Sequence, residues 1–512
     1  MNRDRDRDIV IGVDSSTTAT KAVAWDAQGS FVAEGRSAVP MHTPKPGWYE
    51  QDPEAWWGAL QTALHQLWLR VSPERVAALA IANQRETVAA LLPDGSAARP
   101  AILWLDERCA REVVWLSSEL GRERLHALTG RPPDMTTAVY SVAWMLRHER
   151  ATYQRVSKFV DVSAYLTFKL TDLYATSWAS ADPLGTFDIR KRVWADEILT
   201  FLNLTPEHFC AAQEPGTVMG EVTRRASEAT GLRVGTPLVA GGGDGQCAGL
   251  GLNTTFPGRA YLNLGTAVVS GVFSPQYRID NAFRTLVASG GDGYILETLL
   301  RSGTFLLNWF LQTFGAAGVD WATLEADAKG VALGSDGLLL VPHWSGSATP
   351  HWDDGARGVL LGLSGSHGRP HVYRALLEGI ALEQGLMSRG VEAAGGEVIT
   401  EVVLTGGGAQ SELWCKIIAD VLGKRVLLPE GSEATTLGAG ILAAVGAEWY
   451  KGAPEAASAM TRIAGEVLPD AAAYARYAEL LQIYSRIYPA IKELNAALTP
   501  FRGLSVDKEA FQ

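Results

Sequence analysis

A glycine-rich segment at residues 239–251, VAGGGDGQCAGLG, presents a single carboxylate, that of Asp244. Part of it, GDGQCA, fits the G-x-G-x-x-G/A pattern of loops that bind a dinucleotide. Such a loop needs an acidic residue about 20 positions later to hold a ribose, and the sequence there, YLNLG, has none. We therefore favour a segment whose glycines leave room for a substrate and whose Asp244 acts as a general base. The local pattern also leaves open an aspartate that only stabilises its own turn.

Three short turns carry glycine or hydroxyl residues of the kind that bind phosphate oxygens. They are DSSTT at residues 14–18, the pair Gly265-Thr266, and GGG at residues 406–408 before a predicted helix. Each can offer backbone N–H or hydroxyl donors, and each alone could be an ordinary turn. Because the sequence has no G-x-x-x-x-G-K-S/T motif, the occurrence of such turns in both halves of the chain predicts a nucleotide clamped between them.

Asp14 and Lys21 flank the first of these turns. The apolar stretch IVIGV leads directly to Asp14, and a carboxylate at the end of a buried strand is costly unless it meets a cation. Since Mg²⁺ in phosphate sites takes one or two carboxylates, Asp14 is the candidate metal ligand, directly or through water. Lys21 either neutralises a phosphate or points to solvent.

The segment IANQRET at residues 81–87 places Arg85 and Glu86 between two predicted strands, at residues 76–81 and 88–92. An arginine donates hydrogen bonds and a glutamate accepts them, so the pair suits a ligand with several hydroxyl groups. A plain surface ion pair is the alternative.

The elements that must position these residues are read from apolar periodicity. Residues 9–13 and 21–25 predict a strand, turn and strand, and Asp52-Pro53-Glu54 predicts the start of a helix that runs to about Val71. The same strand, turn and strand pattern returns at residues 260–273, half a chain later. Further strands are expected at residues 401–404 and 425–428, with helices at 411–422 and at 471–498, the last broken near Pro489. We predict two α/β domains joined near residues 250–258.

Composition narrows the class of protein. With 512 residues, 47% of them hydrophobic, the chain can form two cores. The net charge of −11 and the lack of a long Lys/Arg run argue against nucleic acid as a partner. No uncharged apolar run reaches the length of a membrane span, and four scattered cysteines suggest neither a disulfide framework nor a zinc site. We expect a cytoplasmic enzyme.

Taken together, these motifs resemble the FGGY family of carbohydrate kinases, which share the fold of actin, hexokinase and Hsp70. Beyond the phosphate turns, the resemblance rests on GWYEQDP at 47–53, PAILWLD at 100–106, GVLLGL at 358–363, HVYRALLE at 371–378 and LTGGGAQS at 404–411. It implies two duplicated ribonuclease H-like domains, residues 1–253 and 254–512, with a central cleft. It also implies ATP and Mg²⁺ as cofactors.

Carried over to this sequence, the resemblance makes Asp244 the base that takes the proton of a sugar hydroxyl and Asp14 the acid near Mg²⁺. The implied sugar-site residues are Arg85, Glu86, Trp104, Asp244 and Gly245. The implied nucleotide contacts are Thr17, Thr18, Lys21, Gly265, Thr266, Asn308, Gly407, Gly408 and Ser411. The expected partners are a small sugar and ATP, without nucleic acid or membrane, and a homodimer is the candidate assembly.

The sequence departs from the family pattern at several positions. Ser16 stands where the first loop often has glycine, Ser141 where a signature lysine is common, and Ser347-Ala348 where many pentulose kinases have Glu-Arg. The Asn-Gln-Arg-Glu-Thr segment is the form typical of glycerol kinases, whereas VAGGGD and ILWLDERC look more like xylulose kinases. We expect phosphorylation of D-xylulose first, and of glycerol or another polyol or pentulose as the alternative. An ATP-regulated binding protein of the actin or Hsp70 type, and a nicotinamide-dependent dehydrogenase, are the competing classes.

Overall fold

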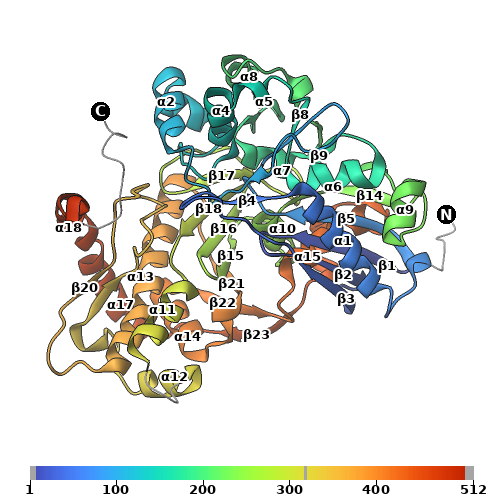
Figure 1. Cartoon of the computed structure of the whole chain (residues 1–512). Coiled ribbons are helices and arrows are strands. Elements are labelled where there is room, and N and C mark those ends of the chain that lie inside the picture. The colour runs from blue at the N-terminus through green and yellow to red at the C-terminus, as the bar shows by residue number, and fades with distance from the viewer. Residues whose placement is uncertain (1–6, 316–319, 502–512) are drawn as a thin grey trace.

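The computed structural model describes residues 7–315 and 320–501, and it contains two large mixed β-sheets with helices packed around them (Figure 1). The first sheet has the order β13-β14-β5-β1-β2-β3. Its strands are β1 (Ile9–Ser15), β2 (Ala19–Asp26), β3 (Phe31–Ala38), β5 (Val76–Asn83), β13 (Val218–Glu221) and β14 (Pro237–Gly243). The second has the order β17-β18-β16-β15-β21-β22-β23. Its strands are β15 (Arg259–Leu264), β16 (Val268–Ser274), β17 (Arg284–Val287), β18 (Tyr294–Leu300), β21 (Glu401–Thr405), β22 (Arg425–Pro429) and β23 (Ile463–Val467).

The two sheets repeat one topology. In the first, β1, β2 and β3 pair antiparallel, and β5 and β14 follow on the other side of β1 in parallel. In the second, β15, β16 and β18 pair antiparallel, and β21 and β22 follow on the other side of β15 in parallel. The predicted duplication of a ribonuclease H-like α/β unit is therefore confirmed.

Ten helices of the first half are described. They are α1 (Pro53–Leu67), α2 (Ala110–Leu120), α3 (Arg122–Thr129), α4 (Ala138–His148), α5 (Arg150–Tyr153), α6 (Val162–Thr171), α7 (Trp178–Ala181), α8 (Asp196–Phe201), α9 (Arg224–Thr230) and α10 (Asp244–Gly251). Short strands in this half are β4 (Glu50–Gln51), β6 (Ala89–Leu91), β7 (Ala101–Ile102), β8 (Lys158–Val160), β9 (Ala175–Ser177), β10 (Phe187–Asp188), β11 (Val193–Trp194) and β12 (Ala211–Gln213).

The second half contains α11 (Thr304–Phe314), α12 (Trp321–Lys329), α13 (Arg369–Gly395), α14 (Glu412–Leu422), α15 (Ala434–Gly446), α16 (Ala453–Met460), α17 (Ala471–Tyr484) and α18 (Ile487–Ala497), with the short strands β19 (Leu339–Val341) and β20 (Val359–Leu361). The C-terminal helix is broken between α17 and α18, just before Pro489, close to the predicted position. None of the helices within 7–315 and 320–501 has the length and apolar character needed to cross a membrane.

Period-2 alternation explains how β1 is buried on both faces. Ile9, Ile11 and Val13 point to one side and pack against α1, whereas Val10 points to the other side. Helix α1 begins as predicted, since Asp52 caps it by accepting a hydrogen bond from the Glu54 N–H, and it ends at Leu67 instead of near Val71.

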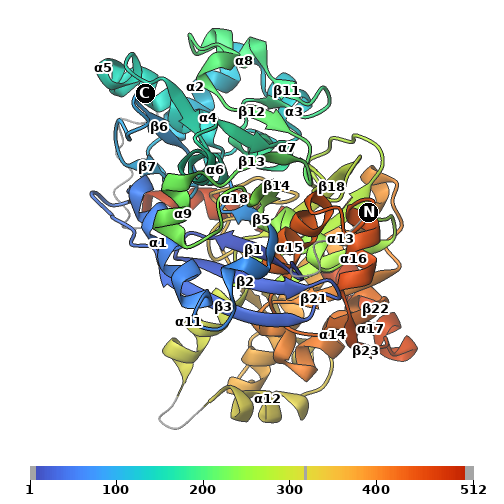
Figure 2. The ribbon, with the colours of Figure 1, turned by 90° about the vertical axis from the view of Figure 1, so that its right-hand side faces the viewer.

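Helix α15 crosses from the second half of the sequence to the first sheet, where it packs on β1 (Figure 2) and against α10 (Figure 1). Glycines allow this approach: a Cβ on Gly12 of β1 would lie 1.8 Å from the Thr436 carbonyl oxygen, and one on Gly438 would lie 1.9 Å from the Cys247 carbonyl oxygen. Side chains of α10 in turn pack into two clusters, one under each sheet. The pair α10 and α15 therefore joins the two halves through a tightly packed backbone contact.

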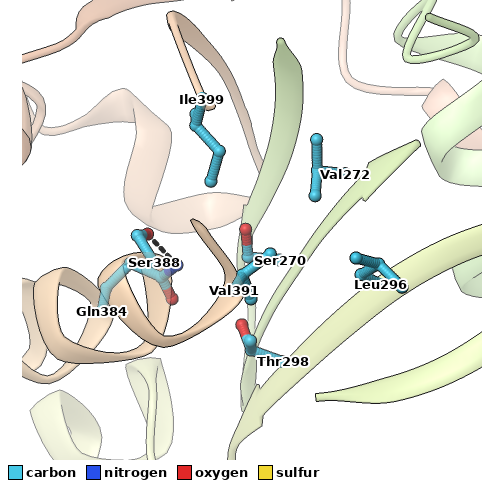
Figure 3. Close-up of a pocket in the computed structure, with 8 residues that line it drawn as sticks. All are labelled: Ser270, Val272, Leu296, Thr298, Gln384, Ser388, Val391 and Ile399. Atoms are coloured by element: carbon cyan, nitrogen blue, oxygen red, sulfur yellow. Dashed lines mark hydrogen bonds between the residues drawn. The ribbon is translucent and has the colours of Figure 1, made fainter. Parts of the chain in front are cut away.

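A small cavity lined by both polar and apolar side chains lies between α13 and strands β16 and β18 (Figure 3). Gln384 donates a hydrogen bond from Nε2 to Ser388 Oγ at 3.1 Å. Its Oε1 atom and Thr298 Oγ1 are buried without a hydrogen-bond partner in the described chain. Unpaired buried polar atoms are costly, and a cavity lined by several of them suits an ordered water.

Candidate active site

Asp244 is the first residue of α10, directly after strand β14. The three preceding glycines, residues 241–243, lie inside the strand. A Cβ on Gly241 would lie 1.9 Å from the Ile81 carbonyl oxygen, and one on Gly243 would lie 2.5 Å from the side chain of Arg85. These glycines therefore make room for β5 and for Arg85, while the Asp244 side chain, 41% exposed, faces outward from the end of the strand.

Arg85 is bound to Asp244 and to a carboxylate of the second half. Its Nε atom lies 3.0 Å from Asp244 Oδ1, and its NH1 group lies 3.0 and 3.1 Å from the two carboxylate oxygens of Glu297 on β18. The Arg85 side chain is only 10% exposed. A guanidinium held between two carboxylates has a fixed orientation, so Arg85 fixes one side of Asp244.

Glu86 is buried and does not pair with its neighbour Arg85. Its carboxylate accepts hydrogen bonds from Arg131 NH1 at 2.7 Å and from Arg284 NH1 at 3.0 Å. Its backbone adopts φ 64°, a left-handed conformation that is rare outside glycine and often found at functional sites. The alternative of a plain surface ion pair is therefore wrong, because each residue has its own buried partners.

Sequence reasoning did not find Arg131, Asp182, Arg284 or Glu297, which complete this charge network. Although burial opposes it, Arg284 and Arg85 hold the pKa of Glu297 at about 2. Burial raises the pKa of Asp182 to about 6, against the effect of Arg131. Asp182 Oδ2 also accepts hydrogen bonds from the Val287 N–H at 2.7 Å and from Gln246 Nε2 at 3.1 Å. No local motif marks these residues, since each pairs with groups far away in sequence.

A cavity next to Glu86 is lined by residues of both halves, including Glu86, Arg131, Asp134, Arg284, Leu299 and Trp352. The first three belong to the first half of the chain and the others to the second. The cavity therefore lies at the contact between the two halves of the chain, next to Glu86.

Asp14 lies in β1 opposite Lys21 of β2. Its Oδ1 atom is buried without a hydrogen-bond partner among the residues that the structure describes. Burial, followed by the nearby Asp244 carboxylate, raises the pKa of Asp14 to about 7. A half-buried carboxylate with one buried, unused oxygen, beside a second carboxylate, is a donor set that fits one Mg²⁺ shared with phosphate oxygens.

Lys21 is engaged by the second half of the chain. Its Nζ atom donates to both carboxylate oxygens of Glu433, just before α15, at 2.7 and 2.8 Å. The alternative of a lysine that points freely to solvent is therefore wrong. A phosphate that reaches Lys21 has to share it with Glu433 or displace that carboxylate.

The first turn is also linked to the predicted sugar site. Trp104, 39% exposed, donates from Nε1 to Thr17 Oγ1 at 3.0 Å, and Thr17 Oγ1 donates to Gln84 Oε1 at 3.2 Å. Thr18 is exposed at the tip of the same turn. Gly245 donates its N–H to Asp244 Oδ1 at 2.7 Å.

The turns of the second half are anchored to helix starts. The carbonyl groups of Gly265 and Thr266 accept hydrogen bonds from the Thr304 and Gly303 N–H groups, each at 2.8 Å, where α11 begins. Asn308 is exposed on that helix. The fixed carbonyls leave the exposed Thr266 hydroxyl free to face a ligand.

The GGG segment enters α14 through a short 3₁₀ turn at Gly407–Gln410. Gly408 packs against the Trp414 ring, Ser411 caps α14 by accepting a hydrogen bond from the Trp414 N–H at 3.1 Å, and Gly407 has open space where a Cβ would be. No described hydrogen bond or ion pair connects Asn308, Gly407 or Ser411 to Asp244. A nucleotide would have to connect the two groups.

Comparison with protein families gives one match in each half of the chain. The model of the FGGY family of carbohydrate kinases, N-terminal domain, matches residues 9–251, and that of the C-terminal domain matches residues 260–447.

The chain belongs to the FGGY family of carbohydrate kinases.

Relatives of this FGGY kinase extend over almost its whole length. It is 30% identical to the xylulose kinase of Escherichia coli, a match that covers 95% of this chain and 100% of that protein. It is 28% identical to the xylulose kinase of Bacillus subtilis over 96% and 99% of the two chains, and 25% identical to the gluconokinase of the same species over 85% and 86%. Among solved structures, the xylulose kinase from Rhodospirillum rubrum matches with a TM-score of 0.89 and 27% identity, covering 95% of this chain and 100% of that one. The protein is thus a sugar kinase by family, and the relatives differ in the sugar that their names give.

Proposed function

We propose that this kinase transfers the γ-phosphoryl group of ATP to a primary hydroxyl of a small neutral sugar, with D-xylulose, giving D-xylulose 5-phosphate, as the first candidate. The observation that carries the proposal is the position of Asp244. It starts a helix between the two sheets, is oriented by Arg85 at 3.0 Å, and lies near the half-buried Asp14 of the first turn.

In the proposed reaction the substrate hydroxyl oxygen attacks the γ-phosphorus. A new oxygen–phosphorus bond forms, the bond from the γ-phosphorus to the bridging oxygen breaks, and ADP leaves. Asp244 accepts the hydroxyl proton, a contribution of about 10²- to 10⁴-fold for general-base catalysis. The Asp244 Oδ1 atom is occupied by Arg85 and by the Gly245 N–H, which supports Oδ2 as the proton acceptor.

The proposed nucleotide site uses both halves. In this proposal Thr17, Thr18 and Lys21 face phosphate oxygens from the first domain, Gly265 and Thr266 from the second, and Asn308, Gly407, Gly408 and Ser411 line the pocket for the rest of the nucleotide. Asp14, with Asp244 nearby, would hold Mg²⁺, which neutralises charge on the transferring phosphoryl group when it is bound.

The charges around Arg85 and Glu86 support a neutral substrate. Three guanidinium groups, of Arg85, Arg131 and Arg284, are already paired with four carboxylates, of Asp182, Asp244, Glu86 and Glu297. An anionic sugar acid would meet a surplus of negative charge there, so we favour a polyol or ketose over gluconate. Xylulose is favoured because relatives that match 95–96% of this chain are xylulose kinases. Glycerol is the second candidate because Arg85 and Glu86 belong to the Asn-Gln-Arg-Glu-Thr segment that resembles glycerol kinases.

The proposal includes a division of the chain into residues 1–253 and 254–512, a cytoplasmic location and a homodimer as the assembly to test. The ATP-regulated binding protein remains the competing class. It requires no sugar-facing base, whereas an exposed Asp244 carboxylate held by the buried Arg85 guanidinium supports an enzyme.

The test is an ADP-release assay with D-xylulose, D-ribulose, glycerol, C4 to C6 polyols and gluconate. We expect sugar-dependent ADP release with the highest kcat/KM for D-xylulose and no useful rate with gluconate. A higher kcat/KM for glycerol would replace the substrate, and ATP turnover that no sugar stimulates would favour the binding-protein class. Wild-type kcat in Asp244→Asn, with the fold intact, would refute the assigned base.

A further inference from the structure

Both residues of the Arg85-Glu86 pair are held by side chains of the second domain. Glu297 of β18 binds Arg85, and Arg284 of β17 binds Glu86, across 212 and 198 residues of sequence. We propose that Glu297 is a positioning residue of the kinase: it fixes the Arg85 guanidinium, and through it the carboxylate of Asp244. This inference rests on the proposed role of Asp244 as the base.

The surroundings of Glu297 are those of a rigid anchor. Its side chain is completely buried. It accepts hydrogen bonds from Arg284 Nε at 2.6 Å, from the Tyr261 hydroxyl at 2.9 Å and from Arg85 NH1 at 3.0 and 3.1 Å. With two guanidinium groups and one phenol around it, the carboxylate is fully paired and has one orientation.

Arg85 transmits that orientation to the base. Its NH1 group is bound to Glu297, and its Nε atom lies 3.0 Å from Asp244 Oδ1, so one planar guanidinium bridges the two carboxylates. The same planar group would turn more freely if one of the two carboxylates were removed. Loss of the Glu297 charge therefore releases Arg85 and disturbs Asp244 without touching it.

The strand that carries Glu297 also leads to the second phosphate turn. Glu297 lies in register with Gly271 of β16, and β18 ends at Leu300. Shortly after it, the Gly303 and Thr304 N–H groups bind the Thr266 and Gly265 carbonyls at 2.8 Å. Glu297 thus ties the base of the first domain to the strand that supports the nucleotide turn of the second. The second domain therefore supplies the residue that anchors Arg85 beside Asp244.

The test compares Glu297→Gln, which keeps the shape and removes the charge, with Glu401→Gln as a matched control. Glu401 also lies on a strand of the second sheet and also pairs with two arginines, Arg259 and Arg425. We expect Glu297→Gln to lower kcat about 10- to 100-fold, as for a misplaced catalytic group, with KM for ATP unchanged. Glu401→Gln should leave kcat unchanged.

A double-mutant cycle separates positioning from general damage. If Glu297 acts through Asp244, then adding Glu297→Gln to Asp244→Asn should cost less than about twofold beyond Asp244→Asn alone. Tyr261→Phe removes only the hydroxyl bond to Glu297, and it should lower kcat by a smaller factor, again without a change in KM for ATP. If Glu297→Gln does not fold, Tyr261→Phe tests the positioning role of Glu297 in its place.

Two results would overturn the inference. The first is a wild-type kcat in Glu297→Gln or, if only Tyr261→Phe folds, in that variant. The second is a full multiplicative loss of kcat when Glu297→Gln is added to Asp244→Asn. Wild-type activity of Asp244→Asn would instead refute the proposed function, because that substitution removes the proposed base itself.

Discussion

Substitution of one glycine tests how the packing of the two halves supports the candidate base. Gly438 of α15 faces the backbone of α10, and a Cβ there would lie 1.9 Å from the Cys247 carbonyl oxygen and 2.6 Å from its carbon. Ordinary van der Waals contact begins at 3.4 Å, so Gly438→Ala forces the two helices apart by about 1.5 Å unless other groups yield. Neither neighbour is a flexible side-chain end, because both atoms belong to the backbone.

Two effects of Gly438→Ala are expected. Overpacking of this kind costs about 1–3 kcal/mol of unfolding free energy. Since Asp244 is the first residue of the displaced helix, a shift near 1 Å should also lower kcat about 100-fold. Urea unfolding followed by circular dichroism measures the first effect, and sugar-dependent ADP release measures the second.

Gly58→Ala is the matched control, because Gly58 lies within helix α1 and has no atom within 4 Å of a Cβ. It should raise stability by about 0.5–1 kcal/mol and leave kcat unchanged. Unchanged stability in Gly438→Ala would refute the close contact of α10 and α15. Reduced stability with normal kcat would refute the link between that contact and Asp244.

Three further outcomes are expected. Asp14→Asn should raise the Tm of the ligand-free protein, because it removes the charge of a half-buried carboxylate whose Oδ1 atom has no hydrogen-bond partner among the described residues. It should also lower kcat at saturating Mg²⁺ about 10- to 100-fold; a lower Tm would contradict the burial argument. Thr298→Val should change unfolding free energy by no more than about 1 kcal/mol, because the Thr298 hydroxyl, which lines the cavity in Figure 3, has no hydrogen-bond partner in the described chain; a larger loss in urea unfolding would contradict this. Burial lowers the pKa of the half-buried His126 to about 4 from 6.5, so its contribution to stability is present above pH 6.5 and is lost as the pH falls toward 4. Between pH 7 and 4, His126→Gln should lose about 1–2 kcal/mol less stability than the parent, after allowance for solvent screening; equal losses would contradict the assignment.

Much of the fold follows from local sequence. The strands at the N-terminus and their repeat after residue 258 have alternating or continuous apolar residues, and the helix after Asp52 has a cap and a proline at its start. These signals act over a few residues, because backbone preference and side-chain direction are local properties. The proposed phosphate turns and the choice of Asp244 as the candidate base also rest on local sequence, and they stay predictions.

The tertiary structure alone decided how these parts are connected. It placed the glycines before Asp244 in a strand and packed α15 of the second half on the first sheet. It paired Lys21 with Glu433. It also gave Arg85 and Glu86 separate partners from β17 and β18. Local sequence does not specify the ion-pair partner of an arginine or a glutamate, because that partner depends on which charges the fold buries beside it. The sequence by itself therefore determined which residues are candidates for the chemistry, and only the fold determined which side chains hold them in place.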